Sequence, residues 1–260
     1  MTGGKAKLTR HGEVAIVTLS DPATRNALSW DMADTLRKLL QQLGDARALL
    51  ICAEGKGFCS GGDMTMEGAG QPAFGAVLDK GLDESVNPLM RELADLDIPV
   101  VNAVNGAAAG AGASLALSAD FVIAAQNSFF LFAFPKVGLA VDAGASWLLP
   151  RLVGMARATR ALMLAERISA DQALEWGMIH AAVPQDELFD HALKLAEQLA
   201  DGPTVAYGQI RKALRQGQHV SYEEALETER EAQRTCGDTD DCLNAVASFR
   251  DKQEPVFRGS

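Results

Sequence analysis

Residues 98–121, IPVVNAVNGAAAGAGASLALSADF, are the stretch from which the fold can be predicted. Residues 98–104 form an apolar run typical of a buried strand, and a loop of small residues then leads into residues 111–118, which favour a helix. Residues 121–125 follow as another short apolar strand. A strand, a helix and a second strand in this order predict an α/β fold with parallel pairing.

The same stretch carries no charge from Ile98 to Ala119, and its Gly106-xxx-Gly110 spacing resembles that of a membrane-spanning helix. Its content argues against a membrane span, because Ala, Gly, Ser and Asn dominate and their hydropathy is weak. The N-terminal residues 1–10 are polar and lack the apolar segment of a signal peptide. We therefore expect a soluble, cytoplasmic protein with no membrane partner.

The chain of 260 residues, with 48% hydrophobic and 22% charged residues, suits a globular protein with a sizeable core. A net charge of −10 disfavours nucleic acid as a partner, because phosphate contacts need clustered Lys and Arg. It does not exclude a small anionic ligand held by local cations and backbone N–H groups. The four cysteines show no metal-ligand spacing, so we expect reduced thiols and no metal site: Cys52, Cys59, Cys236 and Cys242.

Outward from residues 98–121, the pattern predicts further elements on both sides. On the N-terminal side we expect strands at 13–19 and 48–53, a helix opened by Ser29, and a helix over 77–96. The last hundred residues favour helices, with S-x-x-Q and S-x-x-E capping patterns at Ser169 and Ser221. Asp238 is predicted to cap the last helix.

A basic group on one of the predicted C-terminal helices, Arg211, Lys212 and Arg215, is interpreted as a solvated face.

Two loops of small residues could carry chemistry. Residues 57–63, GFCSGGD, follow the strand at 48–53, and two adjacent glycines would let the backbone approach a ligand with its N–H groups unpaired. Residues 105–114, NGAAAGAGAS, join a strand to a helix whose N-terminus is bare and partly positive. This end could hold an oxyanion or a phosphate, but neither G-x-G-x-x-G nor a Walker loop is matched.

The two loops together are similar to those of the crotonase, or enoyl-CoA hydratase/isomerase, family. Residues 98–121 resemble its signature, FCSGGD at 58–63 resembles its other oxyanion loop, and RNAL at 25–28 resembles its CoA-contacting motif. SADQALEWG at 169–177 and PVF at 255–257 also look familial.

The resemblance covers nearly the whole chain. It implies an α/β core of ββα units wound as a spiral over residues 1–200. It also implies a C-terminal helical region over 201–260, within the same functional unit, that assembles a homotrimer or a dimer of trimers.

By the same resemblance, the backbone N–H groups of Gly62 and Ala111 would form an oxyanion hole for an acyl-CoA thioester. The residues expected along CoA are Arg25, Ala27, Ser60, Asp63 and Met64, with Lys252 and Phe257 reaching it across a subunit boundary. CoA enters as part of the substrate, so the resemblance implies no separate cofactor.

The reaction depends on departures from the family pattern. The two glutamates of family hydratases fall on Ser114 and Phe134, and neither side chain can act as a carboxylate base. Asp142 is the only charged residue in 137–150, and its apolar neighbours should raise its pKa. This segment resembles that of phenylacetate-pathway isomerases, except that Val141 replaces the usual proline. We therefore expect an enoyl-CoA isomerase in which Asp142 carries the proton.

Four alternatives stay open at this level. Asp142 could be only a helix N-cap before residues 143–149. Enoyl-CoA hydration could use an acid or base placed elsewhere. Ser114, Asp142 and His180 follow the chain order of a thioester hydrolase triad, although Ser114 is expected inside a helix rather than at a turn. The protein could also bind acyl-CoA without catalysis.

Overall fold

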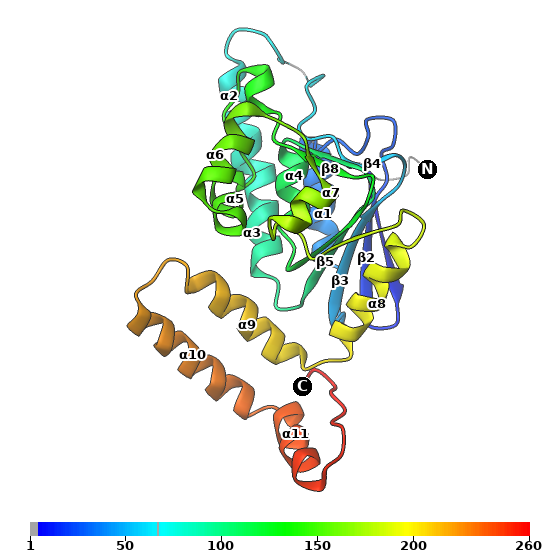
Figure 1. Ribbon diagram of the computed structural model, residues 1–260, viewed down its shortest axis with the longest axis vertical. Helices are drawn as coiled ribbons and strands as arrows, with labels where there is room; N and C mark the ends of the chain where they lie inside the picture. The colour runs from blue at the N-terminus through cyan, green and yellow to red at the C-terminus, as the bar shows by residue number, and fades with distance from the viewer. Residues whose placement is uncertain (1–4, 67) are drawn as a thin grey trace.

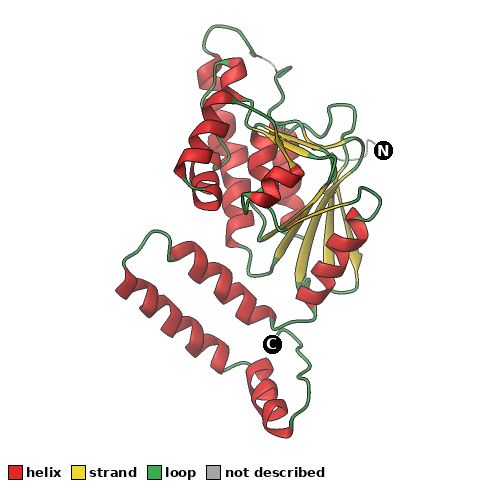
Figure 2. Ribbon diagram, viewed as in Figure 1, coloured by secondary structure: helices red, strands yellow, loops and turns green. Residues whose placement is uncertain are grey.

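The computed structural model describes residues 5–66 and 68–260 and contains two β-sheets with helices around them (Figures 1 and 2). The larger sheet is parallel except for the antiparallel β1–β2 pair. Its strand order is β1 (Ala6–His11), β2 (Val14–Leu19), β3 (Ala48–Ala53), β5 (Val100–Val104), β7 (Phe121–Ala125) and β10 (Ala181–Val183). The smaller sheet has the order β4 (Gly57–Cys59), β6 (Ala107–Ala109), β8 (Phe129–Leu131) and β9 (Ile168–Ser169).

The chain repeats one pattern: a strand in the larger sheet, a strand in the smaller sheet, and then helix. The pairs β3–β4, β5–β6 and β7–β8 all follow it, so β4, β6 and β8 lie side by side. This is the spiral of ββα units that the sequence predicted, and the α/β class is confirmed.

Helices cover both faces of the larger sheet. Figure 1 shows α8 on one face and α1, α3 and α4 on the other. The first helices are α1 (Trp30–Leu40), α2 (Phe74–Gly81), a π-helical turn η1 (Leu82–Val86), α3 (Asn87–Asp95), α4 (Ala111–Ala116) and a 3₁₀ turn η2 (Phe134–Val137). Next come α5 (Ala145–Val153), α6 (Met155–Leu164), α7 (Ala170–Glu175) and α8 (Leu188–Ala200). The last three helices are α9 (Thr204–Gln216), α10 (Tyr222–Gly237) and α11 (Asp240–Asp251).

Three helix starts were predicted correctly from their capping residues, Ser29, Ser169 and Ser221, and one was not. The hydroxyl of Ser29 accepts a hydrogen bond from the Met32 N–H at 3.2 Å, and Ser221 forms a full capping box with Glu224. The cap predicted at Asp238 is wrong, because Thr239 caps α11 and Asp238 ends α10. The predicted helix at 77–96 is interrupted by the π-helical turn η1.

The interpretation of Arg211 as part of a solvated face is also wrong. Arg211 is buried, and its guanidinium donates to the Asp120 carboxylate at 2.6 Å and to the carbonyl oxygens of Leu93 and Leu96. A guanidinium can satisfy several acceptors at once from a planar fork. Arg211 therefore fastens α9 to the end of α3 and the start of β7.

Within the described residues, no helix has both the length and the apolar content needed to cross a bilayer. The same part of the chain contains no group of three His, Cys, Asp or Glu side chains that could hold a metal ion. Cys59 is fully buried, and burial raises the pKa of its thiol to about 11. This thiol is unreactive and fills the core, as expected from the sequence.

Candidate active site

The two glycine-rich loops meet at Gly61 and Gly110. Gly61 has φ +92°, and a Cβ built on it would lie 2.6 Å from the carbonyl oxygen of Ala109. A Cβ built on Gly110 would lie 3.8 Å from the Gly61 Cα. Only a residue without a side chain permits the backbones to approach so closely at Gly61. The next residue in each loop is one of the two proposed donors, Gly62 and Ala111.

Both donor groups are unpaired in the described part of the chain. Among the hydrogen bonds of residues 5–66 and 68–260, neither the Gly62 N–H nor the Ala111 N–H has an acceptor. Ala111 is the first residue of α4, and the preceding Gly110 offers no side chain as a cap. A helix N-terminus with unpaired N–H groups attracts negative charge. The meeting point of the loops can therefore hold an oxygen that becomes anionic.

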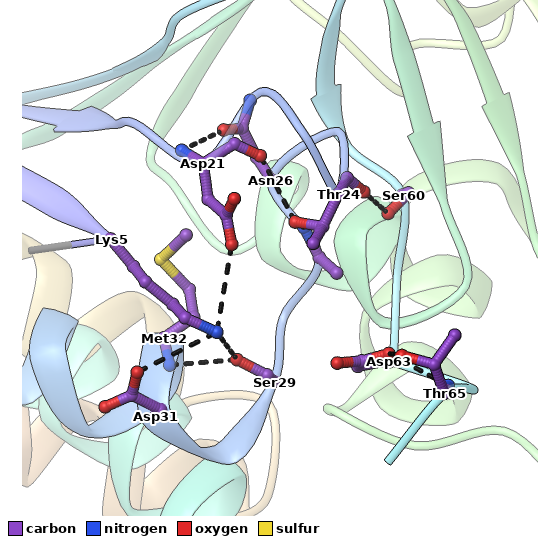
Figure 3. Close-up of polar contacts among 11 residues, drawn as sticks. Lys5, Asp21, Thr24, Asn26, Ser29, Asp31, Met32, Ser60, Asp63 and Thr65 are labelled. Carbon is purple, nitrogen blue, oxygen red and sulfur yellow. Dashed lines mark hydrogen bonds and ion pairs between the residues drawn. The ribbon is translucent and has the colours of Figure 1, made fainter.

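A third loop, residues 24–28, lies against the first glycine-rich loop (Figure 3). The Ser60 N–H donates to the Arg25 carbonyl at 3.0 Å, the Ser60 hydroxyl to the Thr24 carbonyl at 2.9 Å, and the Leu28 N–H to the Gly61 carbonyl at 2.8 Å. These bonds bring the predicted CoA residues Arg25, Ala27 and Ser60 together. Arg25 is exposed, so its guanidinium remains available to a phosphate.

The buried side chain of Asn26 holds this third loop in place. Its amide oxygen accepts from the Asp21 N–H at 2.8 Å (Figure 3). Its amide nitrogen donates to the carbonyls of Glu54 and Gly57 at 2.9 and 3.0 Å. Asn26 lies within the quoted RNAL motif, but its role was not predicted. Its burial is visible only in the structure, so the sequence carried no signal for this role.

Asp63 and Met64 lie beside the donors at the surface. The Asp63 carboxylate accepts from the Thr65 hydroxyl at 2.7 Å and the Thr65 N–H at 2.9 Å, and these bonds lower its pKa. Met64 is 45% exposed.

Lys252 and Phe257 are not brought to this place within one chain. Lys252 is the C-cap of α11, which lies far from β4 in Figure 1. The Phe257 carbonyl accepts a hydrogen bond from the Arg47 guanidinium at 3.3 Å.

Asp142 lies in the connection between η2 and α5. Its Oδ1 atom is buried and has no hydrogen-bond partner among the described residues. Burial raises the pKa of the Asp142 carboxyl to about 6. The interpretation of Asp142 as only a helix cap is wrong, because Gly144 precedes α5 and no side chain caps that helix. A carboxyl with one buried, unpaired oxygen and a raised pKa is a functional candidate on physical grounds.

α4 connects the acid to the donor loop. The Ser114 hydroxyl, fully buried in α4, donates to the Asp142 carbonyl at 3.2 Å. Phe134 is buried, and its ring lies 3.9 Å from a Cβ built on Gly110. Position 114, one of the two that hold glutamates in family hydratases, thus carries a hydroxyl bonded to the main chain. The other, position 134, carries an aromatic ring beside the second glycine-rich loop.

The hydrolase triad is not assembled. The Ser114 hydroxyl donates to a main-chain oxygen, and His180 Nδ1 accepts from the Val122 N–H at 3.1 Å. The His180 ring lies against Phe121, with centroids 4.9 Å apart. His180 is an edge histidine, as the apolar residues around it indicated.

A second residue that sequence reasoning missed is Asn102 in β5. It is fully buried, and its amide nitrogen donates to two main-chain oxygens of α4. A polar side chain in the middle of an otherwise apolar strand was the available signal.

On a spiral of ββα units, two loops offer unpaired main-chain N–H groups, and α4 links one of these loops to an acid. This arrangement defines a class of enzyme that stabilises an oxyanion while moving a proton. The comparisons with known proteins give the family. Residues 9–260 match the family model described as "Enoyl-CoA hydratase/isomerase", and the chain belongs to that family.

Two relatives and one solved structure illustrate the match. A 1,2-epoxyphenylacetyl-CoA isomerase of Escherichia coli K12 is 40% identical over 249 residues, which cover 95% of each chain. A probable enoyl-CoA hydratase of Rhodobacter capsulatus is 41% identical over 247 residues, again 95% of each chain. The structure of an enoyl-CoA hydratase from Polaromonas sp. JS666 aligns with a TM-score of 0.92 at 31% identity, covering 97% of this chain and 99% of that one.

Proposed function

We propose that this protein is an enoyl-CoA isomerase that moves a double bond with a single acid/base residue, Asp142. The Asp142 carboxylate removes a proton from C2 of a 3-enoyl-CoA. The electron pair delocalises into a dienolate, and its oxygen is held by the N–H groups of Gly62 and Ala111. Asp142 then returns the proton to C4, which gives the 2-enoyl-CoA. No water enters the product, so one carboxyl is sufficient.

The observation that carries this proposal is the half-buried Asp142 carboxyl, whose Oδ1 has no partner among the described residues and whose pKa burial raises to about 6. Near neutral pH the group is mostly ionised and can accept a proton, yet it remains acidic enough to give the proton back. In other enzymes, loss of one oxyanion-hole donor typically raises the barrier by about 2.7–4 kcal/mol. Two donors would therefore supply a large part of the stabilisation of the dienolate.

Hydration is disfavoured because it needs a second group to position water. Ser114 is engaged with the Asp142 carbonyl, and Phe134 carries no exchangeable proton. Burial raises the pKa of the Asp142 carboxyl, whereas hydrogen bonds lower the pKa of the carboxyls of Glu54, Asp63, Glu224 and Glu227. The isomerase named among the relatives supports the same choice. Its name adds 1,2-epoxyphenylacetyl-CoA as a second candidate substrate.

We propose further that CoA lies along Arg25, Ala27, Ser60, Asp63 and Met64, and that no cofactor is needed. In this proposal the chain divides into a core, residues 1–200, and a C-terminal helical region, residues 201–260, which assembles a homotrimer or a dimer of trimers. Assembly would bring Lys252 and Phe257 of one subunit to the CoA of its neighbour. The place of action would be the cytoplasm.

The test is to incubate the purified protein with a 3-enoyl-CoA, a 2-enoyl-CoA and 1,2-epoxyphenylacetyl-CoA, and to quantify isomers and hydration products separately. Isomerisation that is lost in Asp142→Asn supports the proposal. Rapid hydration that survives Asp142→Asn contradicts it. The same incubations in D₂O separate an enzyme from a passive acyl-CoA binder, because a binder exchanges no C2 protons.

A further inference from the structure

Asn102 is the polar residue of an otherwise apolar strand. It lies in β5, which pairs with β3 on one side and β7 on the other, and it is fully buried. Its Nδ2 atom donates to the carbonyl oxygens of Leu115 and Ala116, at 2.9 Å in each case. Because carbonyl oxygens can only accept, the amide must direct its NH₂ group to them, and its orientation is fixed.

The two acceptors are the last two residues of α4, the helix that begins with Ala111. α4 has six residues, too few for a helix to be stable without tertiary contacts. Its direction is therefore set by what holds its ends. At the N-terminal end, a Cβ built on Gly112 would lie 2.5 Å from the Cys59 carbonyl, so helix and loop are in close contact there.

At the C-terminal end, Asn102 is the contact that joins α4 to the sheet. The Leu115 carbonyl also accepts from the Ser118 hydroxyl at 2.8 Å. Among the hydrogen bonds of the described residues, the Ala116 carbonyl has Asn102 as its one donor. A buried carbonyl without a donor is costly, so removing the amide should displace this end of the helix or admit water.

We propose that Asn102 is a positioning residue that fixes α4 to the sheet and so keeps the Ala111 N–H directed at the substrate oxygen. This inference rests on the proposed oxyanion hole. A hydrogen bond weakens steeply as its angle departs from linear, so a small rotation of so short a helix changes the strength of the Ala111 bond. Asn102 itself touches no substrate.

The matched control is Ser128, which is also buried and whose hydroxyl donates to the Val104 carbonyl of β5 at 2.8 Å. Ser128→Ala removes a side-chain bond to the same strand, but no bond to α4. Asn102→Ala removes both donors to α4. Asn102→Asp keeps the volume and, when protonated as burial favours, keeps one donor; it remains informative if the alanine variant fails to fold.

The first measurement is the infrared carbonyl band of hexanoyl-CoA labelled with ¹³C at the thioester carbon, free and bound. Hydrogen bonds from the oxyanion hole lower the frequency, and this saturated ligand cannot isomerise. We expect the shift to be largest in the wild type and in Ser128→Ala, smaller in Asn102→Asp, and smallest in Asn102→Ala. The dissociation constant of hexanoyl-CoA should stay within about threefold of the wild type, because most contacts to CoA are elsewhere.

The second measurement separates kcat from KM with a 3-enoyl-CoA. We expect kcat to fall about tenfold in Asn102→Ala with KM little changed, less than the 10²–10³-fold loss typical of deleting an oxyanion donor. An unchanged carbonyl shift in Asn102→Ala, or an equal loss in Ser128→Ala, overturns the inference, as does a wild type without any shift. A wild type that shows the shift but no isomerisation contradicts the proposed reaction and leaves the role of Asn102 intact.

Discussion

Replacing Asp142 by asparagine removes the proposed proton carrier and keeps the size and shape of the side chain. General acid–base catalysis contributes about 10²–10⁴-fold to a rate, and here one group performs both proton transfers. We therefore expect Asp142→Asn to lower kcat for 3-enoyl-CoA isomerisation by about 10³–10⁴-fold. In the wild type, kcat/KM should fall as the pH drops below about 6, because protonated Asp142 cannot act as the base.

The same substitution should stabilise the fold at neutral pH. The Asp142 carboxyl has an ordinary pKa of 3.8 when unfolded and a pKa of about 6 when folded. Below pH 3.8 both states are protonated and burial of a charge costs nothing. As the pH rises from 3.8 to 6 the unfolded state ionises first, and above 6 the folded state carries the full penalty. At about 1.36 kcal/mol per tenfold change in acidity this penalty is about 3 kcal/mol, or about 2 after allowing for partial exposure.

The assay combines product analysis by chromatography with urea unfolding at pH 4 and pH 8. Asp142→Asn should be about 2 kcal/mol more stable than the wild type at pH 8 and nearly equal to it at pH 4. The control is Asp186→Asn, which changes an exposed carboxylate and should alter neither activity nor the pH dependence of stability. An asparagine variant with more than a tenth of the wild-type kcat, or one whose stability gain is the same at both pH values, would refute the reasoning.

Three other substitutions test the parts that surround the acid. Ser114→Ala removes the bond to the Asp142 carbonyl and should lower kcat about tenfold with unchanged KM; unaltered steady-state kinetics would contradict this. Gly61→Ala places a Cβ against the Ala109 carbonyl at positive φ and should cost about 2 kcal/mol or more in chemical unfolding, together with most of the activity; a fully active, equally stable variant would show that the loops do not pack as described. Arg211→Met leaves the Asp120 carboxylate without its cation and should lower the unfolding free energy by about 3 kcal/mol. A loss below 1 kcal/mol would mean that the ion pair is not buried in solution.

The elements predicted best from the sequence are those whose residue pattern follows directly from burial. The strands at 48–53 and 121–125 are continuous apolar runs, buried on both faces, and the structure has them with the same bounds. β1 (Ala6–His11) was not predicted, because only its first residue is buried and the rest of AKLTRH carries no apolar alternation. It exists because it pairs with β2 as an antiparallel hairpin, which is a tertiary property.

The helix at 77–96 was predicted as continuous because periodicity does not distinguish α from π turns. The structure inserts the π-helical turn Leu82–Val86, and this shifts the faces of α2 and α3 relative to each other. Arg211 was misread for a similar reason. On the same helix Lys212 is exposed and Arg215 half-buried, and the acceptors of Arg211 come from residues more than 90 positions earlier in the chain.

The site was predictable where small residues mark it, and not where single polar side chains organise it. Glycine-rich loops predict that two backbone segments approach each other closely, and a lone aspartate in an apolar stretch predicts a raised pKa of its carboxyl. The pairing of Ser114 with the Asp142 carbonyl, and of Asn102 with the end of α4, joins segments that are 28 and 13 residues apart in sequence. A contact between such distant segments cannot be predicted from a local sequence pattern. A buried polar residue in an apolar run can be flagged, but its partner cannot be named.

These contacts connect the donor loop and the acid loop through one short helix, α4. In the proposed site, the first residue of α4 would offer its N–H to the substrate. The hydroxyl of the fourth residue donates to the acid loop, and the carbonyls of the fifth and sixth accept from Asn102 in the sheet. The separation of donor and acid would then depend on α4 and on the Ser114 bond that ties the acid loop to it. Such an arrangement suits a proton that leaves and returns on one face of the acyl chain. Family hydratases carry a glutamate at position 114 to act on water, and here the hydroxyl at that position donates to the Asp142 carbonyl instead.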